Sequence, residues 1–246
     1  MLCYDHPVQL KQKTIWLAQS PHTYVMRRSR RARQLAIRVD IWRGIEVVVP
    51  WRVPYVVAQR FVSDKRGWLQ DKVIQLERLR REIPRRSLKT GTNLPLLGQK
   101  WRLVVRPLPA GKMARIKECG SVLQLELPQG RAAKDLIERW YRRKARDFFG
   151  QVTTEQAQKL QVKIKRIVIN DPHTQWGSCS VDGRLSFGWR LMLAPRRVAA
   201  YVAAHEVAHI KRHDHTPVFW RVVGQLDPHF RSHRKWLKEH EHTLVL

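Results

Sequence analysis

Two histidines stand four residues apart near the C-terminus, in the segment His205-Glu206-Val207-Ala208-His209. On an α-helix, residues four apart differ by about 40° in direction and about 6 Å in height, so both imidazoles can face one metal ion. Glu206 then lies beside an open coordination position, where it can act as a general base toward water. The motif therefore predicts a helix.

The residues before this motif are apolar and have helical spacing. We expect the helix to begin just after Pro195, with Val198, Val202 and Ala203 near the same stripe as His209. The plain alternative is a solvent-facing helix that holds two histidines by chance. An accidental surface motif has no need of an apolar helix, so this context favours a metal site.

A tetrahedral catalytic zinc ion takes a third protein ligand. Eight of the eleven histidines follow residue 200. His213 would lie about 12 Å beyond His205 on a continuing helix, which is too far. His215 follows Asp214 and precedes Pro217, where we expect the helix to end and the chain to turn back. The sequence therefore favours His215 over His213, with Asp214 as either a partner of a ligating histidine or a helix-terminating residue.

The rest of the chain predicts an α+β fold, with a mostly antiparallel N-terminal β part followed by a long helix. Alternating and helical apolar spacing separate the segments. The strands expected are 35–41, 45–49, 96–97, 101–105, 113–118, 121–127, 162–169 and 185–193. The helices expected are 54–82 with a break at Gly67, 132–149 and 153–160, besides the motif helix.

Strand patterns give way to helical ones near Gly130, which is the best candidate for a boundary. We therefore expect an irregular lead-in over 1–23, a basic β-rich part over 24–130 and a part carrying the motif over 131–246. The sequence shows no internal repeat. It does not indicate an oligomeric state.

The strand expected over 185–193 alternates strictly between apolar and polar residues and leads directly into the motif helix. A strand in this position could bind an extended peptide by strand addition. A strand that only packs its apolar face on the core explains the pattern equally well.

Composition excludes several classes of protein. The chain has 246 residues, of which 43% are apolar, enough for a sizeable core. The longest apolar run, Val198 to Ala204, is far shorter than the roughly 20 residues that cross a bilayer. The N-terminus has no secretory signal pattern. Cys3, Cys119 and Cys179 have no paired spacing, which favours ordinary thiols in a reducing compartment. We expect a cytoplasmic protein without membrane contact.

The chain is strongly basic. It has 48 Lys and Arg against 20 Asp and Glu, a formal net charge of +28, and five arginines fall within residues 27–33. Such a field attracts polyanions, so nucleic acid is a possible partner through an Arg-rich surface. A merely solvated basic surface is the alternative.

Beyond these patterns, the C-terminal third resembles a known family. The resemblance rests on Thr174 to Ser180 with its Trp-Gly-Ser-Cys core, on Arg184 to Pro195, on Tyr201 to Ile210, and on His215, Phe219-Trp220, Pro228 and Trp236-Leu237. These residues look like the YgjP-like metallopeptidase-domain family, which is related to the SprT-like and WLM zinc proteases. The similarity extends more loosely over residues 24–242.

The resemblance implies a zincin-like catalytic part within residues 131–246. It implies that His205, His209 and His215 are zinc ligands and that Glu206 is the catalytic acid/base. Gln175 stands where the family usually has Arg, and Gly188 where a polar residue is common, but neither change alters the implied zinc ligands. The Trp-Gly-Ser-Cys segment, including Cys179, is expected to be a packed turn under the motif helix.

The leading function predicted is a zinc metalloendopeptidase acting on proteins or peptides. The alternatives are a nucleoside triphosphate pyrophosphatase, an activity attributed to some members of the family, and a DNA-associated protease or binding module of SprT-like type. No Gly-rich phosphate loop or acidic magnesium cluster supports the nucleotide alternative. Trp176, Trp189, Trp220 and Trp236 are expected to be core residues rather than base-stacking platforms.

Overall fold

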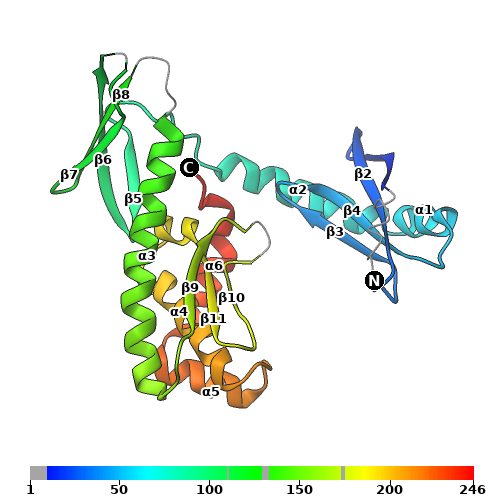
Figure 1. The fold of residues 1–246 in the computed structure, drawn as a ribbon. Helices are drawn as coiled ribbons and strands as arrows, with labels where there is room; N and C mark the ends of the chain where they lie inside the picture. Colours follow the sequence, from blue (N-terminus) through cyan, green and yellow to red (C-terminus); the bar gives the residue numbers. More distant parts are fainter. Residues whose placement is uncertain (1–9, 110, 129–132, 173–174) are drawn as a thin grey trace, which may run out of the picture. The chain divides into compact units, whose positions relative to one another are not determined.

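The described part of the chain forms a mixed α+β structure of several small sheets and six α-helices (Figure 1). The computed structural model describes residues 10–109, 111–128, 133–172 and 175–246. Contacts divide the chain into two compact units, Met1–Ile83 and Pro84–Leu246. Each unit has its own apolar core.

The first unit is a four-stranded sheet with two helices. The strand order is β1-β2-β4-β3, with β2 and β4 parallel and the other two pairs antiparallel. Its elements are β1 Leu10–Leu17, β2 Ser20–Ser29, β3 Ala36–Asp40, β4 Gly44–Pro50, α1 Tyr55–Asp64 and α2 Arg66–Glu82. Met26 and Val47 from the sheet pack with Ala58 and Leu69 from the helices.

Two expectations for this unit need correction. The lead-in expected to be irregular contains β1 and the start of β2, joined by a tight turn in which Ala18 and Gln19 have positive φ. Most of β1 is exposed, so its residues carry no apolar period that would reveal a strand. The helical segment breaks at Lys65, between α1 and α2, and not at Gly67.

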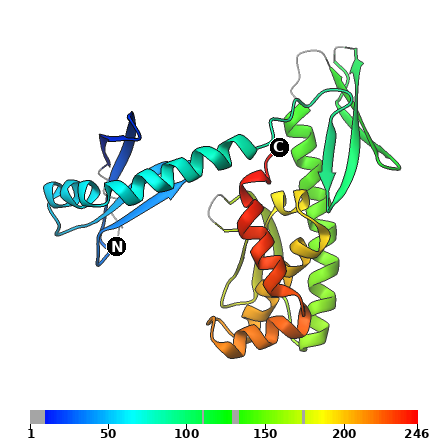
Figure 2. The ribbon, with the colours of Figure 1, turned by 180° about the vertical axis from the view of Figure 1, so that it is seen from behind.

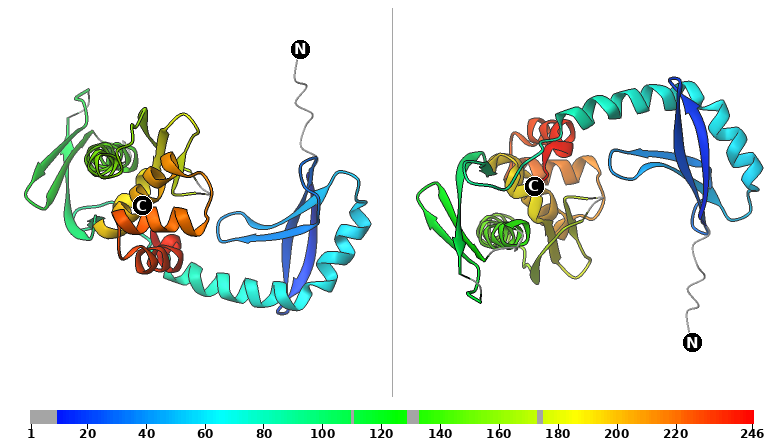
Figure 3. Two further views of the ribbon diagram at one scale, coloured as in Figure 1. Left: turned by 90° about the horizontal axis from the view of Figure 1, so that it is seen from below. Right: turned by 90° about the horizontal axis from the view of Figure 1, so that it is seen from above.

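The second unit begins with a sheet that packs on one long helix. The strand order is β5-β6-β8-β7, with only β6 and β8 parallel. The elements are β5 Asn93–Leu96, β6 Gln99–Leu108, β7 Arg115–Cys119, β8 Val122–Pro128 and α3 Ala133–Leu160. Figure 3 looks along α3, with this sheet on one side and α4, Arg196–Lys211, on the other.

Helix α3 replaces the two shorter helices expected over 132–149 and 153–160. Gly150 lies within it, and a Cβ built there would meet nothing within 4 Å. A single Gly lowers helix propensity without ending a helix whose flanking turns are packed in the core. Trp140 from α3 packs against Trp101 of β6, and Tyr141 stacks on Trp189, so this helix joins the sheet to the remainder of the unit.

A second sheet of three strands, order β10-β11-β9, leads to the helical end of the unit. The elements are β9 Arg166–Asn170, β10 Gly177–Cys179, β11 Arg184–Gly188, the 3₁₀ helix η1 Trp189–Leu193, α4, α5 Pro217–Leu226, α6 Phe230–His240 and the 3₁₀ helix η2 Glu241–Thr243. Helices α5 and α6, orange to red in Figure 2, pack against α4.

The strand expected over 185–193 ends at Gly188, and the rest of its alternating pattern is 3₁₀ helix. Trp189, Leu191, Met192 and Leu193 are all buried, so this stretch lacks the exposed face that a half-buried strand requires. Strand β11 pairs with β9 on one side and β10 on the other, which leaves it no edge for an added strand. Among the described strands of this sheet, β9 and β10 are both edges.

The boundary expected near Gly130 falls just before α3, outside the described residues. The contacts place the division after Ile83 instead. The β5–β8 sheet shares one core with α3 and α4, so the change from strand to helix patterns marks a layer and not a boundary. Among the described helices, none is both long and apolar enough to cross a bilayer.

Candidate metal centre

Helix α4 presents the motif directly after an apolar stretch, Val198 to Ala204. It begins after Pro195, whose carbonyl accepts hydrogen bonds from the amides of Val198 and Ala199. Repeated alanines favour helix and let neighbouring elements approach closely. Its buried residues are Val198, Ala199, Tyr201, Val202, Ala203, Ala204, Glu206, Val207 and Ala208. The two histidines and the glutamate therefore sit on a helix fixed by packing on several sides.

Three imidazole nitrogens converge at one point. Nε2 of His205 lies 3.2 Å from Nε2 of His209 and 3.2 Å from Nε2 of His215. One ligand atom from each of the three residues lies within 4.8 Å of the others. Two nitrogens about 2.05 Å from a tetrahedral ion stand about 3.3 Å apart, so these spacings fit a zinc ion.

The ring orientations suit metal binding. Nδ1 of His209 lies 3.0 Å from the carbonyl oxygen of Arg212, at the end of α4. Donation of the Nδ1 proton to that carbonyl leaves the Nε2 lone pair for a metal. Nδ1 of His205 is buried and has no hydrogen-bond partner among the described residues. The pKa of His205 is lowered to about 3, mainly by burial and then by the other two histidines. A neutral ring at physiological pH is the ligand form of histidine.

A short turn after α4 positions His215. The Asp214 carboxylate accepts a 2.8 Å hydrogen bond from the Thr216 hydroxyl and a longer one from the Thr216 amide. Thr216 is the N-cap of α5, and Pro217 is its first residue. Asp214 thus stabilises the turn that returns His215 to the site. His213, the candidate disfavoured by the sequence, is outside the three-histidine cluster.

Glu206 is the buried acid of the site. It is only 5% exposed, and burial raises its pKa to about 8. Its carboxylate lies against Gly177 of β10, where a Cβ would stand 2.6 Å from Oε1 and 2.7 Å from Cγ of Glu206. Only glycine fits this approach. The sequence gives no sign that position 177 must be glycine, because that requirement comes from a contact between distant segments.

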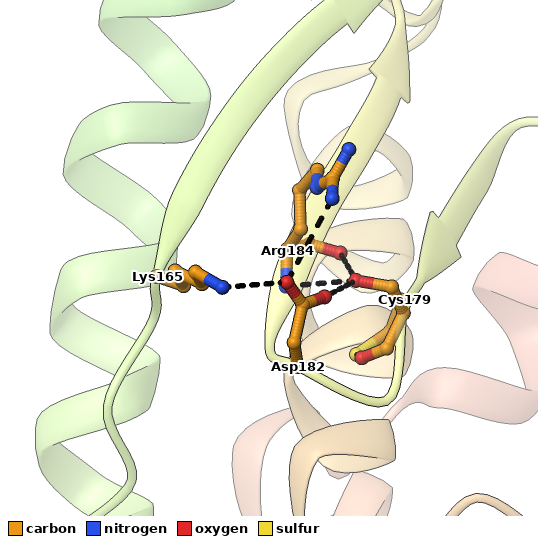
Figure 4. A network of polar contacts seen from close by, with 5 residues as sticks. Lys165, Cys179, Asp182 and Arg184 are labelled. Carbon is orange, nitrogen blue, oxygen red and sulfur yellow. Dashed lines mark hydrogen bonds and ion pairs between the residues drawn. The ribbon is translucent and has the colours of Figure 1, made fainter.

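Strand β10 is held under α4 by the hairpin that joins it to β11. Asp182 is the centre of that turn (Figure 4), with its carboxylate 2.8 Å from Lys165 Nζ and hydrogen-bonded to the Ser180 hydroxyl. Arg184 adds an ion pair, and its amide donates to Ser180 Oγ at 3.0 Å. These contacts fix the segment that carries Gly177.

Cys179 follows in the same strand and is partly buried against the core. Its pKa is raised to about 11, first by burial and then by the carboxylates of Glu206 and Asp182. A thiol kept protonated in this way suits the packed segment expected under the motif helix, because the thiolate is the reactive form.

Aromatic rings from α5 form a wall beside the three histidines. The fully buried Phe219 ring has its centroid 4.5 Å from that of His209 and 5.0 Å from that of His205. The half-buried Trp220 ring lies 5.6 Å from His205 and 5.9 Å from His215. Among the other tryptophans expected in the core, Trp189 is fully buried, whereas Trp176 and Trp236 are partly buried and pack against the core.

A helix carrying a His-Glu-His motif, with a third histidine and a buried glutamate beside it, is an arrangement typical of metal-dependent peptidases. The sequence matches the YgjP-like metallopeptidase domain over residues 33–240, so the chain belongs to the YgjP-like metallopeptidase family. No match was found among curated proteins. Among solved structures, the metallopeptidase zymogen abylysin of Pyrococcus abyssi aligns with 16% identity and a TM-score of 0.35. That alignment covers 39% of this chain and 99% of abylysin.

Proposed function

We propose that this protein is a zinc-dependent endopeptidase whose ion is held by His205, His209 and His215. The convergence of three Nε2 atoms beside a buried glutamate is the observation that carries the proposal. All of these groups lie within 131–246, which we propose to be the zincin-like catalytic part. Family membership supports a metal-dependent peptidase. The free Cys119 and Cys179 thiols are consistent with a cytoplasmic location.

Glu206 is the residue we assign to proton transfer. When bound, zinc supplies a Lewis acid that polarises the scissile carbonyl and makes a water molecule acidic enough to attack. Glu206 accepts the proton of the attacking water and delivers it to the departing amine. A carboxyl pKa raised toward neutral pH by burial suits a group that must both take and give a proton.

Strand β10 is the element we assign to backbone recognition. It is an edge strand among the described strands, and Gly177 within it touches Glu206. An extended peptide that hydrogen-bonds to this edge would run past the carboxylate. This assignment moves the strand-addition hypothesis from the 185–193 segment to β10, because β11 is paired on both sides.

The test is product release by the purified, zinc-loaded protein, with Glu206→Gln as the blank. The substrates are a disordered protein, with and without single-stranded DNA, and the four nucleoside triphosphates. Peptide release by the wild type alone supports the proposal. Phosphate or pyrophosphate release without peptide products contradicts it and favours a nucleotide hydrolase. Peptide release that survives Glu206→Gln contradicts the assigned mechanism.

A further inference from the structure

A positively charged groove lies between α5 and α6 of the second unit. Its volume is about 940 Å³, at the large end of the range for ligand pockets. Among the described residues that line it there is no acidic side chain. Its cations are Arg221, Arg231, Arg234, Lys235 and Lys238.

Four of these cations form one stripe on α6. Arg231, Arg234, Lys235 and Lys238 follow the i, i+3, i+4, i+7 spacing that puts side chains on one helix face. Like charges at this spacing destabilise a helix. Lys235 has a weak partner in Glu239 at 3.9 Å, on the exposed surface. Arg231 and Arg234 make cation–π contacts with aromatic rings of the groove, whereas the two lysines have no strong ion pair among the described residues. This accumulation of like charge fits a surface that binds an anionic partner.

The groove shares a wall with the three-histidine site. Trp220 lines the groove and also lies within 6 Å of the His205 and His215 rings. The Arg234 guanidinium stands 4.8 Å from the centre of the Trp220 ring. A chain that lies in the groove and crosses Trp220 would thus reach the histidines directly.

The groove's aromatic rings are already engaged. Trp220 and Phe230 stack on each other with centroids 5.4 Å apart and planes 14° from parallel. Arg234 covers Trp220, and Arg231 lies 5.1 Å from the Phe230 centroid. Single-stranded nucleic acid is bound through aromatic faces on which bases stack. Rings engaged by one another and by guanidinium groups favour carboxylates in the groove over stacked bases.

We propose that this groove binds acidic segments of a polypeptide, so that the protease acts next to clusters of Asp and Glu. Arginine side chains pair with carboxylates through two parallel hydrogen bonds, which gives such a groove selectivity for acidic side chains. The part of this inference that concerns cleavage rests on the proposed peptidase function. The binding itself can be measured apart from catalysis.

The binding experiment uses the zinc-loaded Glu206→Gln protein and two fluorescent peptides, one rich in Glu and one with Gln at the same positions. We expect the acidic peptide to bind at least about tenfold more tightly. The groove variant is Arg221→Gln with Lys238→Gln, since neither residue makes an ion pair within the described part of the chain. The matched control is Lys100→Gln with Arg102→Gln, two exposed cations of β6.

Both double variants lower the net charge equally, so a general electrostatic attraction would weaken equally in each. Loss of about tenfold in affinity for the acidic peptide in the groove variant alone supports the inference. Equal loss in both variants overturns it. Tight binding of a single-stranded oligonucleotide that depends on Arg221 and Lys238, with no acidic-peptide binding, overturns it in favour of nucleic acid.

Cleavage separates this inference from the proposed function. If the wild type cleaves acidic and neutral substrates at the same rate, and Glu206→Gln cleaves neither, the peptidase stands and the acidic preference is wrong. If the wild type cleaves no protein while the Glu206→Gln protein binds the acidic peptide through the groove, the groove stands and the peptidase is wrong.

Discussion

Gly177 and Glu206 approach each other so closely that any side chain at position 177 would overlap the carboxylate. The Cβ of an alanine there would lie 2.6 Å from Oε1 and 2.9 Å from Cδ of Glu206. The glycine belongs to an edge strand and the glutamate to α4, so two distant segments determine one position. The hydrogen-bonded turn at Asp182 keeps the strand from moving aside.

Substitution Gly177→Ala should therefore disable the glutamate without removing the metal. The carboxylate must shift, and a displacement of about 1 Å at a reacting group can cost about 100-fold in rate. We expect kcat to fall by about that factor while bound zinc, measured by atomic absorption, stays at one per chain. Peptide hydrolysis under saturating substrate gives kcat.

Gly150→Ala is the matched control, because a Cβ at position 150 meets nothing within 4 Å. It lies inside α3, where alanine stabilises a helix by about 0.5–1 kcal/mol relative to glycine. Its activity should equal that of the wild type. Unchanged kcat in Gly177→Ala would show that Glu206 does not need its present position.

Substitution His215→Ala should show whether His215, and not His213, is the third ligand of the proposed metal site. Only two of the three convergent nitrogens would remain, and even loss of a group that orients a ligand weakens metal binding by about 10–100-fold. We expect zinc affinity, measured by competition with a chelating dye, to fall by at least about 100-fold. His213→Ala is the control, since its ring lies outside the cluster, and it should bind zinc normally. The reverse result would make His213 the ligand.

The three-histidine cluster was predictable from sequence because its geometry is local. The positions of His205, Glu206 and His209 follow from helix periodicity. That of His215 follows from a helix end before Pro217, although α4 already ends at Lys211 and Pro217 opens α5. The mutual fit of Gly177 and Glu206 was not predictable, since it depends on how β10 packs on α4. The groove between α5 and α6 was not predictable either, because it depends on how these two helices lie against each other.

Local patterns were also misleading where burial was unusual. Residues 189–193 alternate as a strand does, but burial on all sides and the turn into α4 make them a 3₁₀ helix. Strand β1 is the opposite case, because its exposed side chains carry no apolar period. Periodicity reports a half-buried element, so it fails for elements that are fully buried or nearly fully exposed.

The two described cysteines should differ strongly in reactivity. Cys119 is exposed, whereas Cys179 is partly buried with a pKa raised to about 11. At pH 8 a thiol with that pKa is about 0.1% thiolate, against roughly 20% for an ordinary cysteine. We expect iodoacetamide to modify Cys119 at least about 100-fold faster, as measured by mass spectrometry of peptides from timed samples. Equal rates would mean that the segment under α4 opens readily.

Burial of Glu206 should make the metal-stripped protein less stable as the pH rises. The folded-state pKa is about 8, above the ordinary value of 4.5, so between these values the folded state binds more protons than the unfolded state. The free energy of unfolding therefore falls as pH rises across this window. His205 changes the free energy of unfolding in the opposite direction, because its folded pKa of about 3 lies below the ordinary value of 6.5. Its contribution to the free energy of unfolding therefore grows as the pH rises to about 6.5.

The Glu206→Gln variant isolates the glutamate, because the variant keeps His205 and has no titrating group at position 206. We expect the two metal-stripped proteins to have similar urea midpoints at pH 5. By pH 8 the variant should be more stable by on the order of a few kcal/mol, since each pKa unit corresponds to about 1.4 kcal/mol. A difference between the two proteins that stays constant from pH 5 to pH 8 would mean that Glu206 titrates like an exposed glutamate, which contradicts its burial beside Gly177.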